Sequence, residues 1–464
     1  MENKVIKSSI WYLLGDVLVK VVTFALTPIF TRILTKSEYG NVANFMAWYS
    51  IFSIIATATL HASIGQARLD YRNQKYAYVK SILLLEICWA LIIYLIVLLL
   101  YPDISIWVGM SKNEITIMFA CILFSQGYII YKGIQAVTYH YKKIVILNLV
   151  IAILTVMISL GLLKICKTKA MARILGEYLP SAMIGLGVFF YYIIARKEKP
   201  KIEFGFYALK ICVPFIPHLL SLNILMNMDR IAINSIWGAE DAAIYSLAYS
   251  CALIISILLQ AMNNAVSPWM GEKLYEKKYE DIRSFSQPYV MFFIMSALLF
   301  MIWGPEVIYI LGGKSYIDAK YVMAPLVMSC IFQFVYTMYV NIEQYSKKTV
   351  GMALASVIAA VTNVLLNAFF IPRFGYVAAA YTTLLSYGIL VIIHMLMVRK
   401  MGLLHVFCTK RIFVILVIAL GSMFAIMYLY SMNNTIRYLI SGFLTVTLCI
   451  GIFKLFYRIK NMEG

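Results

Sequence analysis

The feature that most constrains this chain is a succession of apolar runs, each about as long as a lipid bilayer is thick. Clear ones are Leu83–Leu100, Ile412–Tyr430 and Tyr438–Tyr457. A helix needs about 20 largely apolar residues to cross the hydrocarbon core. Hydrophobic residues make up 62% of the 464 residues and charged ones 13%, whereas soluble domains are about half apolar and about a quarter charged. The sequence therefore predicts an all-α membrane protein with no soluble catalytic domain.

The apolar runs predict about 14 transmembrane helices, an even number that places both termini on one side. Lys and Arg number about 25 on that side and about 11 on the other, so the positive-inside rule places both termini in the cytoplasm. Two of the basic loops are Arg68–Lys80 and Arg196–Lys201, whereas the basic stretch Lys164–Arg173 fits this orientation badly. The predicted spans centre near residues 20, 52, 90, 126, 153, 184, 220, 253, 294, 333, 361, 387, 421 and 447.

Neither the net charge nor the cysteines point to another class of protein. A net charge of +19 would suggest a nucleic-acid partner in a soluble chain, but basic cytoplasmic loops account for most of it. The eight cysteines form no CxxC pair and the five histidines form no HExxH motif. We therefore expect no nucleic acid, no metal and no cofactor, and the cysteines read as small residues of the membrane core.

An internal repeat organises the chain. Residues 71–81 (YRNQKYAYVKS) resemble residues 274–284 (LYEKKYEDIRS) at a constant offset along the chain. The same offset relates Arg196–Lys197 to Arg399–Lys400. Matches in the same order between corresponding spans indicate a duplicated bundle, and the basic loops of both halves fall on the same side. The repeat is therefore predicted to be parallel, with a pseudo-twofold axis along the membrane normal.

The repeat predicts three parts of the chain. Two six-helix bundles resemble those of multidrug exporters of the MATE type, and two further helices follow them. Rocking one bundle against the other would expose the seam between them to each side in turn, as in secondary transporters. Because the chain also lacks a P-loop and a long outer loop, we expect a transporter and not an enzyme. The parts are residues 1–205, 206–405 and 406–464.

Basic residues inside the predicted spans are the best clue to what crosses, because a charge in the membrane is costly unless it is paired or faces water. They are Lys20, Lys132, Lys210 and Arg230. Lys132 and Lys210 lie within about two turns of a predicted cytoplasmic end and can snorkel to the interface. Lys20 follows Asp16 by four residues, so the two either neutralise each other on one helix face or Lys20 faces a cavity.

Arg230 is the strongest candidate for a cation that faces the cavity. It adjoins Asp229, and neighbouring residues on a helix point about 100° apart, so the two cannot closely face one partner. Asp16 and Asp229 are candidates for ion coupling, with local pairing as the alternative. The embedded carboxylates form no cluster that outweighs the cations, so the cavity is predicted to favour an anionic substrate. They include Asp16, Glu86, Glu177 and Glu343.

Two prolines in the seventh predicted span indicate a bend. Pro214 and Pro217 each remove a backbone donor, and a helix that contains both should kink. A bent helix at an interface between bundles is a candidate hinge. Plain packing is the alternative, because proline is common in membrane helices.

Three segments carry a family resemblance: residues 28–40 (PIFTRILTKSEYG), residues 228–246 (MDRIAIN followed by EDAAIYS) and residues 366–380 (LN, IPRFG and AAA). They resemble the Wzx-type polysaccharide flippases of the multidrug/oligosaccharidyl-lipid/polysaccharide exporter superfamily. Ala243 and Val377 stand where that family usually has glycine. The resemblance runs through nearly the whole chain and agrees with the repeat.

The resemblance implies a function and a location. The substrate would be an undecaprenyl-diphosphate-linked oligosaccharide, moved from the cytoplasmic to the outer leaflet of the bacterial inner membrane for surface polysaccharide such as O-antigen or capsule. The cavity cations would bind diphosphate or acidic sugars, Arg230 first, then Lys20 and Arg32. Arg32 either contacts substrate or only stabilises its turn. Partners would be the bilayer and a polysaccharide polymerase or assembly machinery, and H⁺ or Na⁺ is the candidate coupling ion.

Three other functions stay open. A lipid II flippase of the same superfamily has the same charge logic and about 14 helices. A multidrug or cation exporter would share the fold, but its cavity should be dominated by carboxylates. A membrane glycan polymerase or ligase is the enzyme alternative, and it would normally carry a long outer loop, which this sequence does not show.

Overall fold

The computed structural model describes residues 24–138, 140–346 and 348–462, and these residues are helical with short connections and without a strand. In this described part, twelve helices are long and apolar enough to cross a membrane, or thirteen when one bent pair is counted as a span. Every predicted span centre from residue 52 to residue 447 falls inside one of them. The span predicted near residue 20 lies outside the described residues, which begin with a short apolar helix, Phe24–Ile33. The chain is therefore a multi-pass membrane protein.

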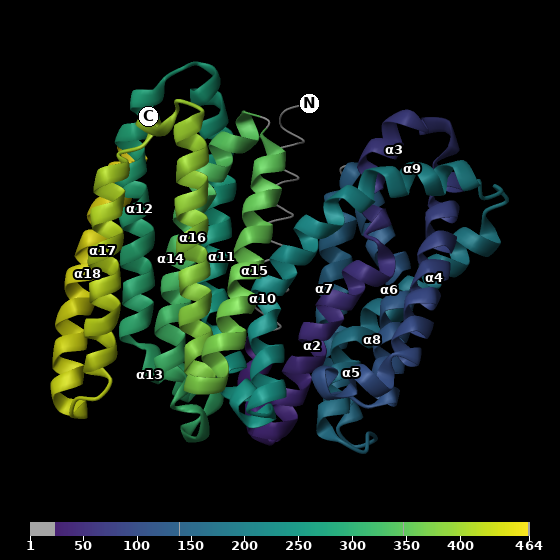
Figure 1. Cartoon of the computed structure of the whole chain (residues 1–464), viewed down its shortest axis with the longest axis horizontal. Helices are drawn as coiled ribbons and strands as arrows, with labels where there is room; N and C mark the ends of the chain where they lie inside the picture. The colour runs from purple at the N-terminus through teal and green to yellow at the C-terminus, as the bar shows by residue number, and fades with distance from the viewer. Residues whose placement is uncertain (1–23, 139, 347, 463–464) are drawn as a thin grey trace. The chain divides into compact units, whose positions relative to one another are not determined.

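The chain divides into two compact units, residues 1–243 and 244–464, which we call unit 1 and unit 2 (Figure 1). Helix α11 begins in the last residues of unit 1 and continues through unit 2. After Phe24–Ile33, unit 1 contains α2 (Lys36–Thr57), η1 (Leu60–Ser63), α3 (Ile64–Asp70), η2 (Arg72–Gln74), α4 (Lys75–Leu99), α5 (Tyr101–Val108), α6 (Lys112–Val137), α7 (Tyr141–Leu162), α8 (Lys169–Phe190), the π-helical turn η3 (Tyr191–Ala195), α9 (Ile202–Cys212), η4 (Val213–Phe215) and α10 (Ile216–Ile236). Unit 2 contains α11 (Ala239–Tyr275), α12 (Tyr279–Ile302), α13 (Gly304–Gly312), η5 (Lys314–Tyr316), α14 (Ala319–Tyr345), α15 (Thr349–Phe374), α16 (Tyr376–Lys400), η6 (Leu404–Val406), α17 (Thr409–Leu429) and α18 (Asn434–Met462).

The internal repeat is visible in the order and spacing of the helices. Helix α2 begins at Lys36 and α11 at Ala239, while α5 begins at Tyr101 and α13 at Gly304, so both pairs keep the offset of the sequence repeat. Helices α6 and α8 precede α14 and α16 by slightly longer intervals, which are equal for the two pairs. Helices α17 and α18 follow outside this order. The compact units do not test the bundle boundaries predicted at residues 205 and 405, which stay predictions.

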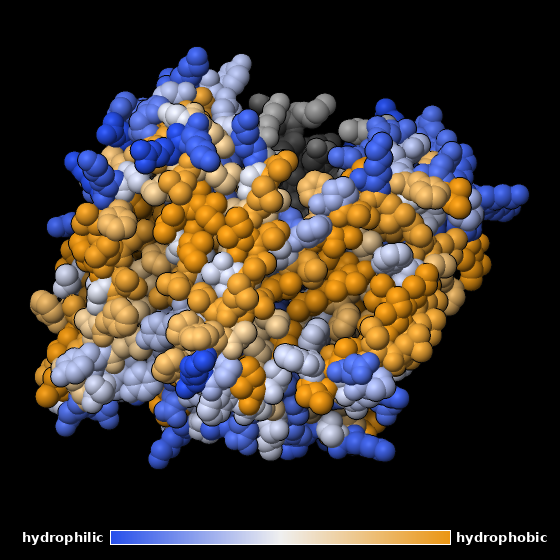
Figure 2. Space-filling model, in the orientation of Figure 1, coloured by the Kyte–Doolittle hydropathy of each residue, from blue (hydrophilic) through white to orange (hydrophobic). Residues whose placement is uncertain are grey.

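The surface of each unit is that of a protein with lipid as its solvent. In Figure 2 hydrophobic residues cover the middle of the visible face and hydrophilic residues gather at the two ends. Large apolar side chains such as Leu99, Val361 and Phe443 are exposed on their helices. In water this surface would favour association, whereas beside acyl chains it needs no partner.

The helices of unit 1 pack closely where small residues face one another. A Cβ placed on Gly127 of α6 would lie 2.1 Å from the carbonyl oxygen of Gly185 in α8. A Cβ on Gly185 would lie 2.0 Å from the carbonyl oxygen of Phe124. Lipid supplies no hydrophobic drive for helix association, so this close van der Waals contact holds the helices together.

The basic stretch that fits the orientation badly is partly neutralised inside unit 1. Helix α8 begins at Lys169, so Arg173 lies in its first turns and is buried. The Arg173 Nη1 atom lies 2.7 Å from Glu177 Oε2, one turn further along the helix. The guanidinium also stacks on the Phe30 ring, 4.9 Å from its centroid. Arg173, the last basic residue of this stretch, is therefore paired with Glu177 on the same helix.

Two further embedded carboxylates contact histidines within their own units. Glu86 Oε1 accepts from the His61 backbone N–H at 3.2 Å, just after the Ala58–Thr59 break where the chain bends by 58°. Glu343 of α14 and His394 of α16 are both buried, with 2.9 Å between Oε1 and Nδ1. Glu86 and Glu343 thus each contact a histidine of their own unit.

Candidate functional site

Helix α10, which carries Arg230, is fixed against α2 within unit 1. A Cβ on Gly40 would lie 1.8 Å from the Ala239 carbonyl oxygen, so only glycine fits at this contact. Gly40 ends the first family-like segment and Ala239 lies inside the second. Two of the three segments that resemble the flippases therefore meet in space, and their residues build a helix junction.

A polar contact beside this junction joins α2, α5 and α10. The Asn44 side chain donates to the Val108 carbonyl at 2.8 Å, where α5 ends. The next residue, Gly109, has φ of +61°, and a Cβ there would lie 2.9 Å from Asn234 Nδ2. The junction fixes the part of α10 one turn beyond Arg230, so the fold sets the direction of that side chain.

Arg230 and Asp229 occupy different environments, as their adjacency on one helix predicts. Asp229 is 1% exposed, whereas Arg230 is only partly buried. The Arg230 Nη1 atom donates to Asn227 Oδ1 at 3.3 Å, one turn earlier in α10. Roles for these two residues in substrate binding or ion coupling stay predictions.

Arg32 lies at an exposed corner, and the other two predicted residues of this end, Lys20 and Asp16, lie outside the described residues. Arg32 Nη1 donates to the Pro28 carbonyl at 3.4 Å. The corner is closed by a capping box, in which Glu38 N donates to Thr35 Oγ1 at 3.2 Å and Thr35 N donates to the Glu38 carboxylate at 3.0 Å. These capping bonds give the corner a source of stability other than Arg32.

Pro214 and Pro217 lie at a short 3₁₀ turn that divides the apolar span Ile202–Ile236 into α9 and α10. Helix α9 ends at Cys212, the 3₁₀ turn η4 contains Pro214, and Pro217 is the second residue of α10. Proline is tolerated there because the first helical N–H groups have no partner in the helix. In Figure 1, α9 and α10 run in different directions. The hinge stays a prediction.

A second group of cations lines a pocket of about 680 Å³ at the α3 end of unit 1. The lining comes from α3, η2, the start of α4, the end of α6, the start of α7 and the π-helical turn η3. We call it the basic tyrosine pocket, after the residues Arg68, Arg72, Lys75, His140, Lys143, Tyr76, Tyr78, Tyr131, Tyr191 and Tyr192.

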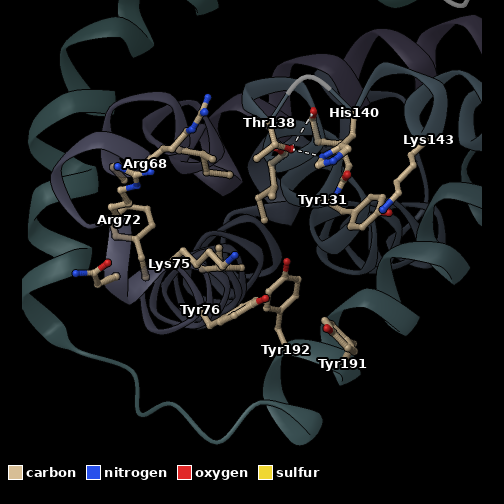
Figure 3. A pocket seen from close by; sticks show the side chains of 17 residues that line it. Arg68, Arg72, Lys75, Tyr76, Tyr131, Thr138, His140, Lys143, Tyr191 and Tyr192 are labelled. Atoms are coloured by element: carbon tan, nitrogen blue, oxygen red, sulfur yellow. Dashed lines mark hydrogen bonds between the residues drawn. The ribbon is translucent and has the colours of Figure 1, made fainter.

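Figure 3 shows how these side chains surround the pocket. Arg68 and Arg72 lie on one side of the view, and His140 and Lys143 lie on the other. His140 Nδ1 is 2.9 Å from the Thr138 hydroxyl, which fixes the direction of the ring. The pocket thus presents cations from two sides.

Stacked side chains stiffen the wall of this pocket. The Arg196 guanidinium lies over the Tyr76 ring, 4.0 Å from its centroid, and over the Tyr191 ring at 4.9 Å. A hydrogen bond to the Tyr191 hydroxyl raises the pKa of Arg196, so its charge is retained. Lys80 donates to the Ile193 carbonyl at 2.9 Å and so ties α4 to the π-helical turn.

The sequence shows the basic residues of this pocket, but it does not show that they lie close together in the fold. The positive-inside rule explains Arg68–Lys80 and Arg196–Lys201 as cytoplasmic loops, so they carry no site prediction. Two sequence patterns could have indicated the site. Tyrosines alternate with basic residues in YRNQKYAY (residues 71–78), and Tyr191–Tyr192 lies shortly before Arg196–Lys197. No pattern within one loop could reveal that α3, α6, α7 and η3 meet there.

Comparisons with known proteins place the chain in a family. The model of the family described as polysaccharide biosynthesis protein matches residues 5–274, more than half of the chain. The chain belongs to the polysaccharide biosynthesis protein family. The MatE family model also matches, over residues 214–369. The predicted superfamily of multidrug, oligosaccharidyl-lipid and polysaccharide exporters is thereby confirmed.

Two relatives are similar to this chain at low identity. Protein 1 of the Lsg locus of Haemophilus influenzae is 24% identical over 383 residues, which are 78% of this chain and 90% of the relative. A low-salt glycan biosynthesis flippase of Haloferax volcanii is 26% identical over 171 residues, 36% of each chain.

Solved structures show the same fold at low identity. The lipid II flippase MurJ in an inward closed conformation matches with a TM-score of 0.72 and 16% identity, over 97% of this chain and 99% of that one. An inward-facing multidrug transporter of the MATE family matches with a TM-score of 0.62 and 12% identity, over 84% and 94%. The predicted fold is confirmed, and these likenesses extend to the fold alone.

Proposed function

We propose that this protein is a flippase that moves an undecaprenyl-diphosphate-linked oligosaccharide from the cytoplasmic to the outer leaflet. The observation that carries this proposal is a polysaccharide biosynthesis family match over more than half of a chain whose described part is largely membrane-spanning helices. A glycan on a charged diphosphate cannot cross hydrocarbon unaided, because the desolvation of its polar groups is too costly. A membrane protein of glycan synthesis with no catalytic motif is suited to supply that path.

In this proposal Arg230 binds the diphosphate or an acidic sugar, and Lys20 and Arg32 assist it. Arg230 is partly buried in a helix of a membrane span and close to the fixed junction of α2 and α10. A guanidinium suits this task because it donates two parallel hydrogen bonds to phosphate oxygens. Asp229 or Asp16 would take the coupling ion, H⁺ or Na⁺, and α9 and α10 would pivot at Pro214 and Pro217.

The proposed location follows from the proposed substrate. The chain would lie in a bacterial cytoplasmic membrane with both termini in the cytoplasm, and it would deliver its substrate to a polymerase of surface polysaccharide. The basic loops of the sequence support this orientation.

Deletion of the gene tests the proposed function. We expect the lipid-linked oligosaccharide to accumulate and the surface polysaccharide to disappear, and the wild-type gene to restore both. Arg230→Ala at a normal protein level should restore neither. Arg399→Ala, which removes one exposed arginine from the last turn of α16, is the matched control and should complement. Normal surface polysaccharide with Arg230→Ala would contradict the role of Arg230.

Two alternatives predict different phenotypes. A lipid II flippase is favoured by the match to MurJ over nearly the whole chain, and its loss would arrest cell-wall synthesis. A multidrug exporter is favoured by the MatE match in residues 214–369, and its loss would raise sensitivity to cationic dyes without changing the lipid-linked pool.

A further inference from the structure

We propose that the basic tyrosine pocket of unit 1 binds a lipid headgroup that carries a phosphate ester beside a hydroxyl. The proposal rests on the proposed function only where that lipid is the transported substrate. The pocket is distinct from the predicted cavity residues on α10, and it lies among loops that the sequence assigns to the cytoplasmic side.

The charge of the pocket selects an anion. Arg68 and Arg72 face Lys143 and His140 across the pocket, and Lys75 lies near them (Figure 3). Among the lining residues in the described part of unit 1, none is Asp or Glu. Arginine forks and a lysine ammonium around a space of about 680 Å³ suit a phosphate or diphosphate, which accepts hydrogen bonds at every oxygen.

The pocket also contains an acceptor that needs a donor. The Gln135 Oε1 atom is buried and has no hydrogen-bond partner in the structure, and Gln135 lines the pocket. An orphaned buried acceptor costs free energy unless a ligand or water donates to it. A fully ionised phosphate diester has no proton to donate, whereas a sugar or glycerol hydroxyl beside the phosphate can donate. The tyrosine rings on the same walls suit the apolar face of a sugar or glycerol group.

In unit 2 the end of α14 carries a buried polar side chain whose partner lies on α16. Gln135 lies in the last turn of α6, and Glu343 lies in the last turn of α14. Glu343 is bonded to His394 of α16. Counted from the start of each helix, Gly187 of α8 stands at the position that His394 holds in α16. An added Cβ on Gly187 would meet nothing within 4 Å. Unit 2 thus satisfies its polar group internally, and unit 1 has no such side chain.

Binding to the purified full-length protein in detergent tests the proposal. The probes are N-acetylglucosaminyl citronellyl diphosphate, dihexanoyl phosphatidylglycerol, dihexanoyl phosphatidic acid and inorganic diphosphate. The test variant is Arg68→Gln with Arg72→Gln. The matched control is Arg399→Gln with Lys400→Gln, two exposed cations at the end of α16 in unit 2, outside the pocket. Elution as a single symmetric peak in size exclusion shows that each variant is folded.

We expect the Arg68/Arg72 variant to weaken binding of the favoured probe at least about tenfold, as the loss of charge-assisted hydrogen bonds implies, and the control to leave it unchanged. Tighter binding of N-acetylglucosaminyl citronellyl diphosphate assigns the pocket to the lipid-diphosphate substrate. Tighter binding of phosphatidylglycerol assigns it to a membrane phospholipid. Equal affinities of wild type and the Arg68/Arg72 variant for all four probes overturn the proposal, as does preference for inorganic diphosphate over every lipid.

A second variant tests the hydroxyl. Gln135→Leu removes the orphaned acceptor and keeps the cations, so it should weaken phosphatidylglycerol more than phosphatidic acid, which lacks the glycerol hydroxyls. Equal loss for the two lipids would contradict this part. Because the binding assay needs no transport, its failure leaves the deletion phenotype and the Arg230 test of the flippase untouched.

Discussion

Gly40 illustrates how a single residue fixes the chain just after the helix that carries Arg230. Its missing side chain lets α2 approach the carbonyl of Ala239, and a Cβ would overlap that oxygen at 1.8 Å. The resemblance to the flippases singles out this glycine, but only the structure shows that its function is close packing. This contact fixes the start of α11, directly after α10, and α10 itself packs on α2.

Replacement of Gly40 should destabilise the protein. We predict that Gly40→Ala lowers the free energy of unfolding by about 1–3 kcal/mol, the usual cost of overpacking. Gly161→Ala in α7 is the matched control, because an added Cβ there meets nothing within 4 Å and alanine favours the helix. Thermal unfolding of the two purified variants checks this, and equal melting temperatures would contradict the packing.

The buried Glu343–His394 pair gives a prediction about charge in unit 2. His394→Leu should destabilise by about 3–5 kcal/mol, because it leaves a buried carboxylate without its partner. The double variant Glu343→Leu/His394→Leu should recover most of that loss. A double-mutant cycle of melting temperatures measures the coupling. Additive effects of Glu343→Leu and His394→Leu would show that the pair does not act as a unit.

At the scale of elements, hydropathy was sufficient for the spans and insufficient for their breaks. An apolar run of about 20 residues predicts a crossing helix whatever its neighbours are. The 58° bend after α2 depends on left-handed Ala58 and Thr59, two residues with no preference for that conformation. Tertiary contacts such as the one from Glu86 to the His61 N–H stabilise the bend, and no local pattern encodes them.

The break between α9 and α10 gives a prediction at this scale. Pro214→Ala with Pro217→Ala restores two backbone donors and lets α9 and α10 join as one helix. If the break is a hinge, this variant should accumulate lipid-linked oligosaccharide at a normal protein level. Pro180→Ala, within α8, is the control and should complement the deletion. Full complementation by the double variant would rule out the hinge.

At the scale of the whole molecule, the repeat was readable because the offset between the two halves hardly changes. Long insertions between α5 and α6 or their counterparts would have hidden it, yet the starts of corresponding helices keep nearly the same offset throughout. The basic tyrosine pocket was not readable, because its cations come from several segments and each has a sufficient explanation as part of a cytoplasmic loop. The predicted residues Lys20 and Asp16 lie outside the described residues.

The orientation of unit 1 is testable with single cysteines in a chain from which the eight native cysteines are removed. Asn73→Cys lies beside the pocket, and Asn113→Cys lies in the first turn of α6, at the opposite end of that helix. We predict that a membrane-impermeant maleimide labels position 113 in intact cells and position 73 only after lysis. The reverse pattern would place the pocket on the outer side.

The central claim is that the protein moves a lipid-linked glycan across the bilayer, and reconstitution tests it most directly. Purified protein is placed in vesicles that contain a fluorescent undecaprenyl-diphosphate oligosaccharide, and a glycosidase added outside reports the fraction that has crossed. We predict that the wild type gives the enzyme access to the inner-leaflet pool as well, and that Arg230→Ala leaves that pool protected while Arg399→Ala does not. In protein-free vesicles about half of the glycolipid should stay protected from the glycosidase. The same protection with the wild type, under a proton or sodium gradient imposed in either direction, would contradict the account.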